Sequence, residues 1–526
     1  MKKWAFYLFM FALWPALTSC TGAPKSAAID ETRLVGRPGG APIDDEGARH
    51  GALWYRLLLH DDQMQVRVRL LEPAQQTSFF LPGPWAGRDD FAEDIALGSA
   101  MGPQGILPMT IQRSQGRIDV DSGRNAPWVE LHYTVRLHSR DDEAWRFRPH
   151  LRKETFFAYA PTFLILPSDQ ISRKMRDIPV EVLVPSQWEV VTTWPGATVM
   201  PSQVDPSSRV HGFIVDDVRS LRDAFIAAGH SIEAHQLQLG EQQLTIAFEP
   251  DFEARGEELV EPIAGIVRSY VERFGFERSM AVFVRHNANA SPQTMRGMGR
   301  RGGFVLELPR DPKIDENTLL LIAHEAFHMW NGHELVPEPA HERQTRWFKE
   351  GVTHYVALQT LRSLGKVEDR FVREELARAA HNYLRNPVLL GIEAGVIDHV
   401  RFPYDQGMLM AMVLDVSIRQ TTHSRHTLQD WLEALLVEAR SYPRRHYDED
   451  TLRRSLVKFL AGGDPAPLHL WDRHIRRGIA LDVPRHFESL GLHWLETDPS
   501  EPARLLPLDV PQALHRTLFP GPKNEH

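Results

Sequence analysis

The sequence predicts a multidomain α+β protein: an all-β, sandwich-like domain first, a mixed domain of helices and strands next, and a helical region last. Three observations support this prediction. The chain has 526 residues, more than one ordinary hydrophobic core can organise. Apolar and polar residues alternate from about residue 50 to 250, which is typical of strands. Beyond that point the apolar spacing becomes helical.

Composition excludes several classes of protein. Apolar residues make up 42% of the chain and charged residues 25%, which indicates a globular protein rather than a disordered one. The formal charge of −9 gives no basic field for binding nucleic acid. The single cysteine, Cys20, excludes an intramolecular disulfide and any metal site built from several cysteines.

The N-terminus predicts a secretory signal. Lys2 and Lys3 precede an apolar run, Trp4–Leu17, that is too short to span a bilayer comfortably. The ending Leu-Thr-Ser-Cys resembles the lipobox of bacterial lipoproteins, which implies that residues 1–20 are a signal peptide and that Cys20 carries a lipid. A plain signal peptide is the alternative. Thr21 replaces the aspartate of an inner-membrane retention signal, which favours the outer membrane of a bacterial cell envelope, facing the periplasm or the exterior. Residues 21–50, which are rich in Gly, Pro and Ala, are predicted to form a flexible tether.

The β domain is expected to span residues 51–249. Its clearest strands are Met64–Leu70, Val129–Leu137, Ile178–Val184 and Leu244–Phe248, separated by clusters of Pro, Gly and Asp. No residue pattern in it predicts chemistry, so we interpret it as a scaffold or as a wall of the site.

The mixed domain is expected at residues 250–420. It opens with a helix that ends at Gly275, followed by a strand at Met280–Arg285. A Gly/Arg segment, Gly297–Gly303, then leads into a strand at Phe304–Leu308. Helices are expected at 421–490 and a tail at 491–526, with no strand predicted after Phe402.

A metal site is the strongest chemical signal in the chain. His324 and His328 lie four residues apart on a predicted helix that Asp315 or Asn317 can cap and Gly332 can end. Two imidazoles at this spacing can bind one ion, and the intervening Glu325 can act as a general base.

Glu350, on a second predicted helix beginning at Trp347, can supply the third ligand. Two histidines and a glutamate are a catalytic ligand set for one Zn²⁺ ion, with one position left open. A solvated helix charge is the alternative for Glu350. Tyr404 is a candidate donor to the oxyanion, and an ordinary turn tyrosine is its alternative.

These motifs resemble the gluzincin metallopeptidases, and within them the glycyl aminopeptidase family. The resemblance covers roughly residues 230–490. It includes Trp330-Asn331 after the histidine pair, the segment Phe348–Tyr355, and Tyr404-Asp-Gln-Gly407 opening an apolar helix. It implies a thermolysin-like catalytic domain at 250–420, hydrolysis of peptides with aminopeptidase-like action, and a tyrosine, here Tyr404, that stabilises the transition state.

Two features depart from that family. About 35 residues follow Gly491, too few for the PDZ domain that the family often carries, so no PDZ domain is expected. The Gly/Arg segment also lacks the glutamate with which related aminopeptidases bind a free amine.

Glu307 is the candidate substitute for that glutamate. Arg300 and Arg301 instead suggest a preference for an acidic or C-terminal carboxylate, with a solvated loop as the alternative. His354 is predicted to lie on the face of Glu350 and to contact substrate or support the site, and a satisfied polar residue is its alternative.

The sequence therefore predicts a lipid-anchored zinc metallopeptidase. Its expected partners are a peptide or protein substrate and, through the lipid, a membrane; nucleic acid is not expected, and no oligomeric state is assigned. Two alternatives stay open. One is a catalytically inactive scaffold lipoprotein that keeps its zinc, and the other is a zinc hydrolase of a non-peptide amide or ester.

Overall fold

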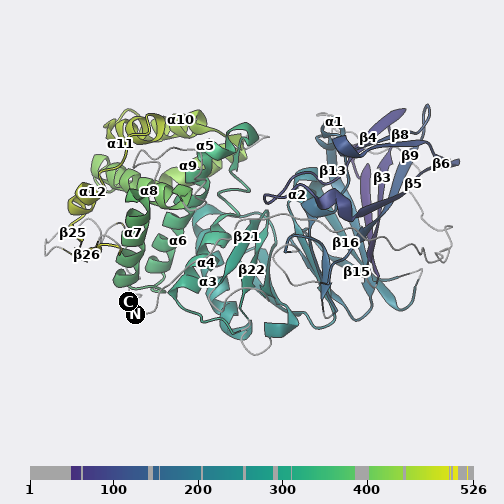
Figure 1. The fold of residues 1–526 in the computed structure, drawn as a ribbon, viewed down its shortest axis with the longest axis horizontal. Coiled ribbons are helices and arrows are strands. Elements are labelled where there is room, and N and C mark those ends of the chain that lie inside the picture. The colour runs from purple at the N-terminus through teal and green to yellow at the C-terminus, as the bar shows by residue number, and fades with distance from the viewer. Residues whose placement is uncertain are drawn as a thin grey trace.

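The computed structural model describes residues 49–507 with gaps at 61–62, 140–145, 153, 203–204, 253–255, 288–293, 310, 386–401, 442–445, 497 and 499–500, together with Leu518. The predicted signal peptide, Cys20 and residues 21–48 of the predicted tether lie outside these residues; the last two residues of that tether, Arg49 and His50, form a strand. Figure 1 shows a β-rich half and a helical half, with α3, α4, β21 and β22 between them. No helix among the described residues is long and apolar enough to cross a membrane.

A large mixed sheet forms the first half of the molecule. Its strands follow the order β15 (Thr198–Pro201), β16 (Ser208–Asp217), β13 (Met175–Pro185), β2 (Leu53–His60), β3 (Gln63–Leu71), β9 (Trp128–Arg136), β5 (Ile95–Gly102) and β6 (Gly105–Leu107), and β1 (Arg49–His50) pairs with β13. Alternation creates the buried face, because Met64, Val66, Val68 and Leu70 of β3 are buried while the residues between them are not.

Two smaller sheets complete the β domain. One has the order β10 (His150–Arg152), β11 (Thr155–Tyr159), β17 (Phe225–Gly229) and β14 (Glu189–Thr192). The other has the order β12 (Leu166–Pro167), β4 (Gln76–Phe80), β8 (Arg117–Asp121) and β7 (Met109–Gln112). Side chains of all three sheets share one hydrophobic core. The molecule as a whole has the mixed α+β, multidomain character that the sequence predicts.

A separate five-stranded sheet lies at the centre of the molecule. Its order is β18 (Glu233–Leu239), β19 (Gln242–Phe248), β20 (Met280–His286), β22 (Gly303–Leu308) and β21 (Arg296–Arg300). The predicted domain boundary at residue 249 is therefore wrong, because β19 pairs in parallel with β20 rather than with any strand of the β domain. Strand periodicity identifies a strand but does not say which sheet it joins.

The Gly/Arg segment also differs from the expectation of a solvated loop. Arg296–Arg300 forms β21, which pairs antiparallel with β22 and is the edge of the central sheet.

Helices cover the central sheet and form the second half of the molecule. They are α3 (Gly256–Phe274), α4 (Glu316–Phe327), α5 (Glu342–Arg346), α6 (Thr353–Ser363), α7 (Asp369–Leu384), α8 (Phe402–Thr421), α9 (Leu428–Arg440), α10 (Glu449–Leu460), α11 (Ala466–Leu470) and α12 (Val483–Ser489). Two π-helical turns, η7 (Trp347–Val352) and η8 (Trp471–Arg476), precede α6 and follow α11. One hydrophobic cluster runs from the central sheet through these helices.

The end of the chain contains strands that the sequence analysis did not predict. β23 (Val336–Pro337) pairs with β24 (His446–Tyr447), and β25 (Leu492–Leu495) pairs with β26 (Arg504–Pro507). The predicted tail is thus partly folded, because Leu492 and Leu505 are buried in the helical core. These strands are too short for a period-two pattern to show in the sequence.

The β domain and the central sheet pack directly against each other. Phe157 and Phe225 of the β domain share a cluster with Phe283 and Val305 of the central sheet. The rings of Phe157 and Phe283 stack at 5.6 Å between centroids. Side chains of the β domain therefore cover part of one face of the central sheet.

Candidate active site

The helix α4 presents both predicted histidines. Asp315 caps it by accepting hydrogen bonds from the backbone N–H groups of Asn317 and Thr318, as one of the two predicted caps. The helix ends at Phe327, with His328 at its C-cap, rather than continuing to Gly332. Gly332 instead occupies the following turn with φ +138°, where glycine is favoured.

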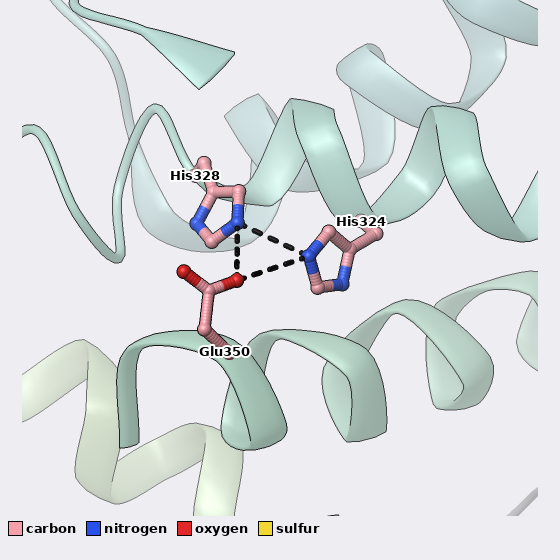
Figure 2. Close-up of side chains that lie close together, drawn as sticks. All are labelled: His324, His328 and Glu350. Atoms are coloured by element: carbon pink, nitrogen blue, oxygen red, sulfur yellow. Dashed lines mark hydrogen bonds and ion pairs between the residues drawn. The ribbon is translucent and has the colours of Figure 1, made fainter. Parts of the chain in front are cut away.

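His324, His328 and Glu350 converge as Figure 2 shows. The Nε2 atoms of the two histidines are 3.1 Å apart. Oε2 of Glu350 lies 3.5 Å from Nε2 of His324 and 3.3 Å from Nε2 of His328. All three side chains are buried, so the predicted ligand set is brought together by two separate helical segments.

The donor set fits a cation. Nδ1 of His328 is 2.9 Å from the carbonyl oxygen of Asn331, so Nδ1 donates and the lone pair of Nε2 faces the cluster. Burial lowers the pKa of His324 to about 3, which keeps that ring neutral. Although burial also opposes ionisation of His328, the charge of Glu350 raises the pKa of His328, so the carboxylate draws positive charge to this place. Two lone pairs and a carboxylate converging in a buried place need a positive ion between them, and this set is one that holds Zn²⁺.

Asn331 links the two ligand-bearing segments. Its amide nitrogen donates to the carbonyl oxygen of Phe348 at 2.9 Å and to the hydroxyl of Thr353 at 3.1 Å. The same residue accepts from His328 through its own carbonyl oxygen. It therefore sets the ring of His328 and the position of Glu350 together. The Trp330-Asn331 pair was part of the family resemblance, but the contacts of Asn331 could be recognised only from the fold.

A glycine pair brings a further helix close to Glu350. A Cβ atom at Gly351 would lie 2.3 Å from Cα of Gly407, and one at Gly407 would lie 2.1 Å from the carbonyl oxygen of Trp347. The helix α8 therefore touches η7 backbone to backbone, which carries Tyr404 to the site.

Tyr404 lies over the ligand set. Its ring stacks on that of His324, with 5.7 Å between centroids. Burial, the charges of Glu350 and Glu325, and a hydrogen bond with Glu350 raise the pKa of Tyr404 well above its usual value. Its hydroxyl therefore stays protonated and can donate.

Glu325 projects beside the ligands, as predicted. Its Oε2 accepts a hydrogen bond from the backbone N–H of Gly299 on β21 at 2.9 Å. Burial raises the pKa of Glu325 to about 7. A carboxylate whose pKa lies near neutrality can both take and return a proton.

Two glycines allow β21 to approach this carboxylate. A Cβ atom at Gly297 would lie 2.1 Å from Cγ of Glu325, and one at Gly299 would lie 2.5 Å from Cβ of His328. These contacts explain the glycines of the Gly/Arg segment. Glycines two residues apart in a strand lie on the same face, so their spacing in the sequence could have indicated a face of β21 that another segment approaches closely.

His354 lies next to the ligands on α6. Its ring centroid is 5.5 Å from that of His324, and its Nε2 is 3.6 Å from Oε2 of Glu375. Arg378 bonds Glu375 at 2.8 Å and the buried Asp405 at 3.1 Å. A chain of polar contacts therefore runs from His354, beside His324, through Glu375 and Arg378 to Asp405, the residue after Tyr404. The sequence analysis did not identify Arg378 or Asp405.

Glu307 is not free to bind an amine. Its Oε2 accepts from Nε of Arg146 at 2.5 Å, and Nε of Arg285 lies 3.9 Å from its Oε1. Although burial opposes ionisation, these arginines lower the pKa of Glu307. Arg146 comes from the β domain, so this partner could not be found from the local sequence.

Arg300 and Arg301 take different positions. Arg301 is 3.3 Å from Asp217, the cap of the short helix α2 (Val218–Arg222), and so is held at the domain interface. Arg300 is buried, with its guanidinium 4.6 Å from the Trp85 ring and 4.9 Å from the Tyr159 ring. Of these two arginines, Arg300 is the one whose side chain leaves β21 on the face that packs against the β domain.

The fold and the site together define a zinc metallopeptidase. In agreement with the resemblance in the sequence, residues 317–390 match the family model of the M61 glycyl aminopeptidases. That segment holds all three ligands and Glu325. No curated protein matches the chain.

Solved structures show the same fold. An aminopeptidase N family protein from Idiomarina loihiensis has a TM-score of 0.66 at 18% identity, covering 84% of this chain and 78% of the other. A mutant M1 zinc metallopeptidase from Deinococcus radiodurans has a TM-score of 0.54 at 16% identity, covering 82% and 95%. The same enzyme bound to a Tyr-Ser-Ala substrate has a TM-score of 0.52 at 16% identity, covering 81% and 93%.

Proposed function

We propose that this protein hydrolyses peptide bonds, with Glu325 as general base and Tyr404 as donor to the oxyanion. The observation that carries the proposal is the buried convergence of two histidines and Glu350, with the carboxylate of Glu325 held beside them by a backbone N–H. The structural neighbour bound to a tripeptide supports a peptide as the substrate.

Each side chain has a separate task. His324, His328 and Glu350 would hold Zn²⁺, and the bound ion would supply a Lewis acid for the attacking water and the scissile carbonyl. Glu325 accepts the proton of the attacking water and delivers it to the leaving amine. The hydroxyl of Tyr404 donates to the oxygen on which negative charge develops.

Glu325→Gln tests this assignment. The variant keeps the shape of the side chain and is not a ligand, so zinc content stays at one ion per chain while kcat falls by roughly 10²–10⁴. Metal analysis and hydrolysis of a peptide library measure both. Undiminished turnover would exclude Glu325 as the base, and absence of turnover in the zinc-loaded wild type would favour an inactive scaffold. Cleavage of esters or amides alone would favour the non-peptide hydrolase.

We further propose that Cys20 carries a lipid that holds the enzyme at the outer membrane of a bacterial cell envelope, with residues 21–50 as a tether. The support is the signal-like sequence that ends at the only cysteine. Labelling of the expressed protein with a radioactive fatty acid is expected for wild type and lost in Cys20→Ser. Equal labelling of both would overturn the anchor.

A further inference from the structure

Several polar atoms beside β21 lack hydrogen-bond partners among the described residues, although they are buried. They are Nε and Nη2 of Arg300, Nη1 of Arg285, the hydroxyl of Tyr159 and Oε1 of Glu307. Buried polar groups are almost always paired, so a group of orphans in one place indicates a missing partner.

These groups lie around two neighbouring aromatic rings, Phe157 and Tyr159. Arg300 lies 4.9 Å from the Tyr159 ring centroid, and Arg285 lies 4.5 Å from that of Phe157. The two rings are 4.9 Å apart and perpendicular. The charges of Glu307, Arg285, Arg300 and Arg146 all act on the phenol of Tyr159. We call Arg285, Arg300, Tyr159 and Glu307 the interface cluster.

The interface cluster has more donors than one water molecule can satisfy. Arg300 offers three N–H groups on its two unpaired nitrogens, Arg285 offers two on its one unpaired nitrogen, and Tyr159 offers a hydroxyl. Among the described residues, the unpaired carboxylate oxygen of the cluster is Oε1 of Glu307. A water accepts about two hydrogen bonds, whereas a carboxylate has about four lone-pair sites. The partner that fits best is therefore an anion with two oxygens.

Charge leads to the same conclusion. Arg146, Arg285 and Arg300 bring three positive charges, and Glu307 and Asp223 bring two negative ones. Asp223 also pairs with His333, and that pairing reduces its hold on Arg300. The cluster retains positive charge, and aromatic surface around it excludes water, which strengthens attraction to an anion.

The interface cluster lies across the edge strand β21 from Glu325. Gly299 turns towards Glu325, whereas Arg300, the next residue of the strand, turns towards the β domain. The charges of Arg300 and Glu325 act on each other, and Arg146 also acts on Glu325. The interface cluster is therefore close enough to Glu325 for its charges to act on that carboxylate.

We propose that the interface cluster binds a carboxylate of the substrate, an acidic side chain or a terminal carboxylate, so that the enzyme selects acidic peptides rather than free amino termini. This inference rests on the proposed peptidase function and specifies its substrate class. It retains the preference predicted from Arg300 and Arg301, but replaces Arg301, which is held by Asp217, with Arg285 and Tyr159.

Tyr159→Phe is the sharpest test. Because its hydroxyl is unpaired within the described part of the chain, its removal leaves the melting temperature unchanged or slightly higher if no ligand is bound. If the hydroxyl binds substrate, KM rises roughly tenfold for acidic peptides and stays unchanged for neutral ones. Arg300→Lys keeps the charge and loses the fork of donors, so it is expected to reduce the same preference.

The measurement uses zinc-loaded wild type, Tyr159→Phe, Arg300→Lys and the matched control Arg301→Gln. The substrates are fluorogenic peptides with Glu or Gln at each position in turn, each with a free or amidated C-terminus and a free or acetylated N-terminus. Wild type and the control are expected to cleave some Glu or free-acid peptides roughly ten- to hundredfold faster in kcat/KM than their neutral partners. The Glu series and the C-terminal series separate the two sources of carboxylate.

Binding of the same peptides to zinc-loaded Glu325→Gln, by calorimetry, separates failure of this inference from failure of the function. Preferred binding of acidic peptides without turnover by wild type would overturn the peptidase and keep the carboxylate site. Turnover with no acidic preference, or a preference unchanged in Tyr159→Phe and Arg300→Lys, would overturn the carboxylate site alone. A requirement for a free N-terminus would also overturn it.

Discussion

Gly297→Ala should disable the general base while leaving the metal site intact. The backbone of Gly297 is extended in β21, so an alanine there meets no backbone strain, only a lack of space. Its Cβ would lie 2.1 Å from Cγ, 2.4 Å from Cδ and 2.7 Å from Oε1 of Glu325. Ordinary contact begins near 3.4 Å, so the two groups must separate by about 1.3 Å.

Glu325 is expected to move rather than the strand. β21 is hydrogen-bonded along its length to β22, whereas the carboxylate is the end of a flexible side chain. A displacement of about 1 Å from productive geometry costs roughly 10² in rate. Overpacking costs about 1–3 kcal/mol of stability. We therefore expect a folded, zinc-containing protein whose kcat is reduced about 100-fold.

Steady-state kinetics, zinc analysis and urea unfolding measure these effects. Gly212→Ala is the matched control, because Gly212 also lies in a strand and its added Cβ would sit 3.7 Å from the nearest atom. In a Glu325→Gln background, Gly297→Ala should lower kcat no further, since both changes act on the same group. A folded Gly297→Ala enzyme with kcat within about twofold of wild type would refute the placement of β21 on Glu325.

Three other outcomes follow from the structure. Arg378→Gln leaves the buried Asp405 with Asn382 as its remaining partner among the described residues. It should destabilise the fold by about 3 kcal/mol in urea and lower kcat towards that of a Tyr404→Phe variant without loss of zinc, and an unchanged kcat would show that Tyr404 is positioned otherwise. Burial lowers the pKa of His150 to about 3, below its unfolded value near 6.5, so this stability is present above pH 6.5 and is lost as the pH falls towards 3. At pH 5 the loss is about 2 kcal/mol, and His150→Phe should remove that part of the pH dependence of unfolding. Removal of metal by a chelator should abolish turnover and lower the melting temperature, with recovery on adding Zn²⁺, because three buried ligands lose the cation that they share.

Local sequence was sufficient for the metal ligands. The spacing of His324 and His328 within a helical turn places both imidazoles on one face, whatever the rest of the fold does. Glu350 could be predicted as the third ligand because the segment that begins at Trp347 predicts a second helix that carries it. The strands of the β domain were equally predictable, since alternation in a segment such as Gln63–Leu71 is a property of that segment alone.

Sheet membership was not local. Gln242–Phe248 reads as a strand in the sequence, but its partner Met280–His286 follows a long helix, and this pairing moved the domain boundary towards the N-terminus. The same limit hid the short strands near the C-terminus, because each is stabilised by burial against distant helices rather than by its own pattern.

What the sequence by itself determined was the set of groups available for chemistry, namely the spaced histidine pair, the carboxylate between them and Glu350, together with the mixed α+β class. What only the tertiary structure decided was the surroundings of that chemistry. Arg146 reaches Glu307 from another domain, and Gly299 reaches Glu325 from another strand. Spacing along a helix fixes the ligands because helical geometry is regular, whereas contacts between domains depend on how whole sheets pack, which no short motif encodes.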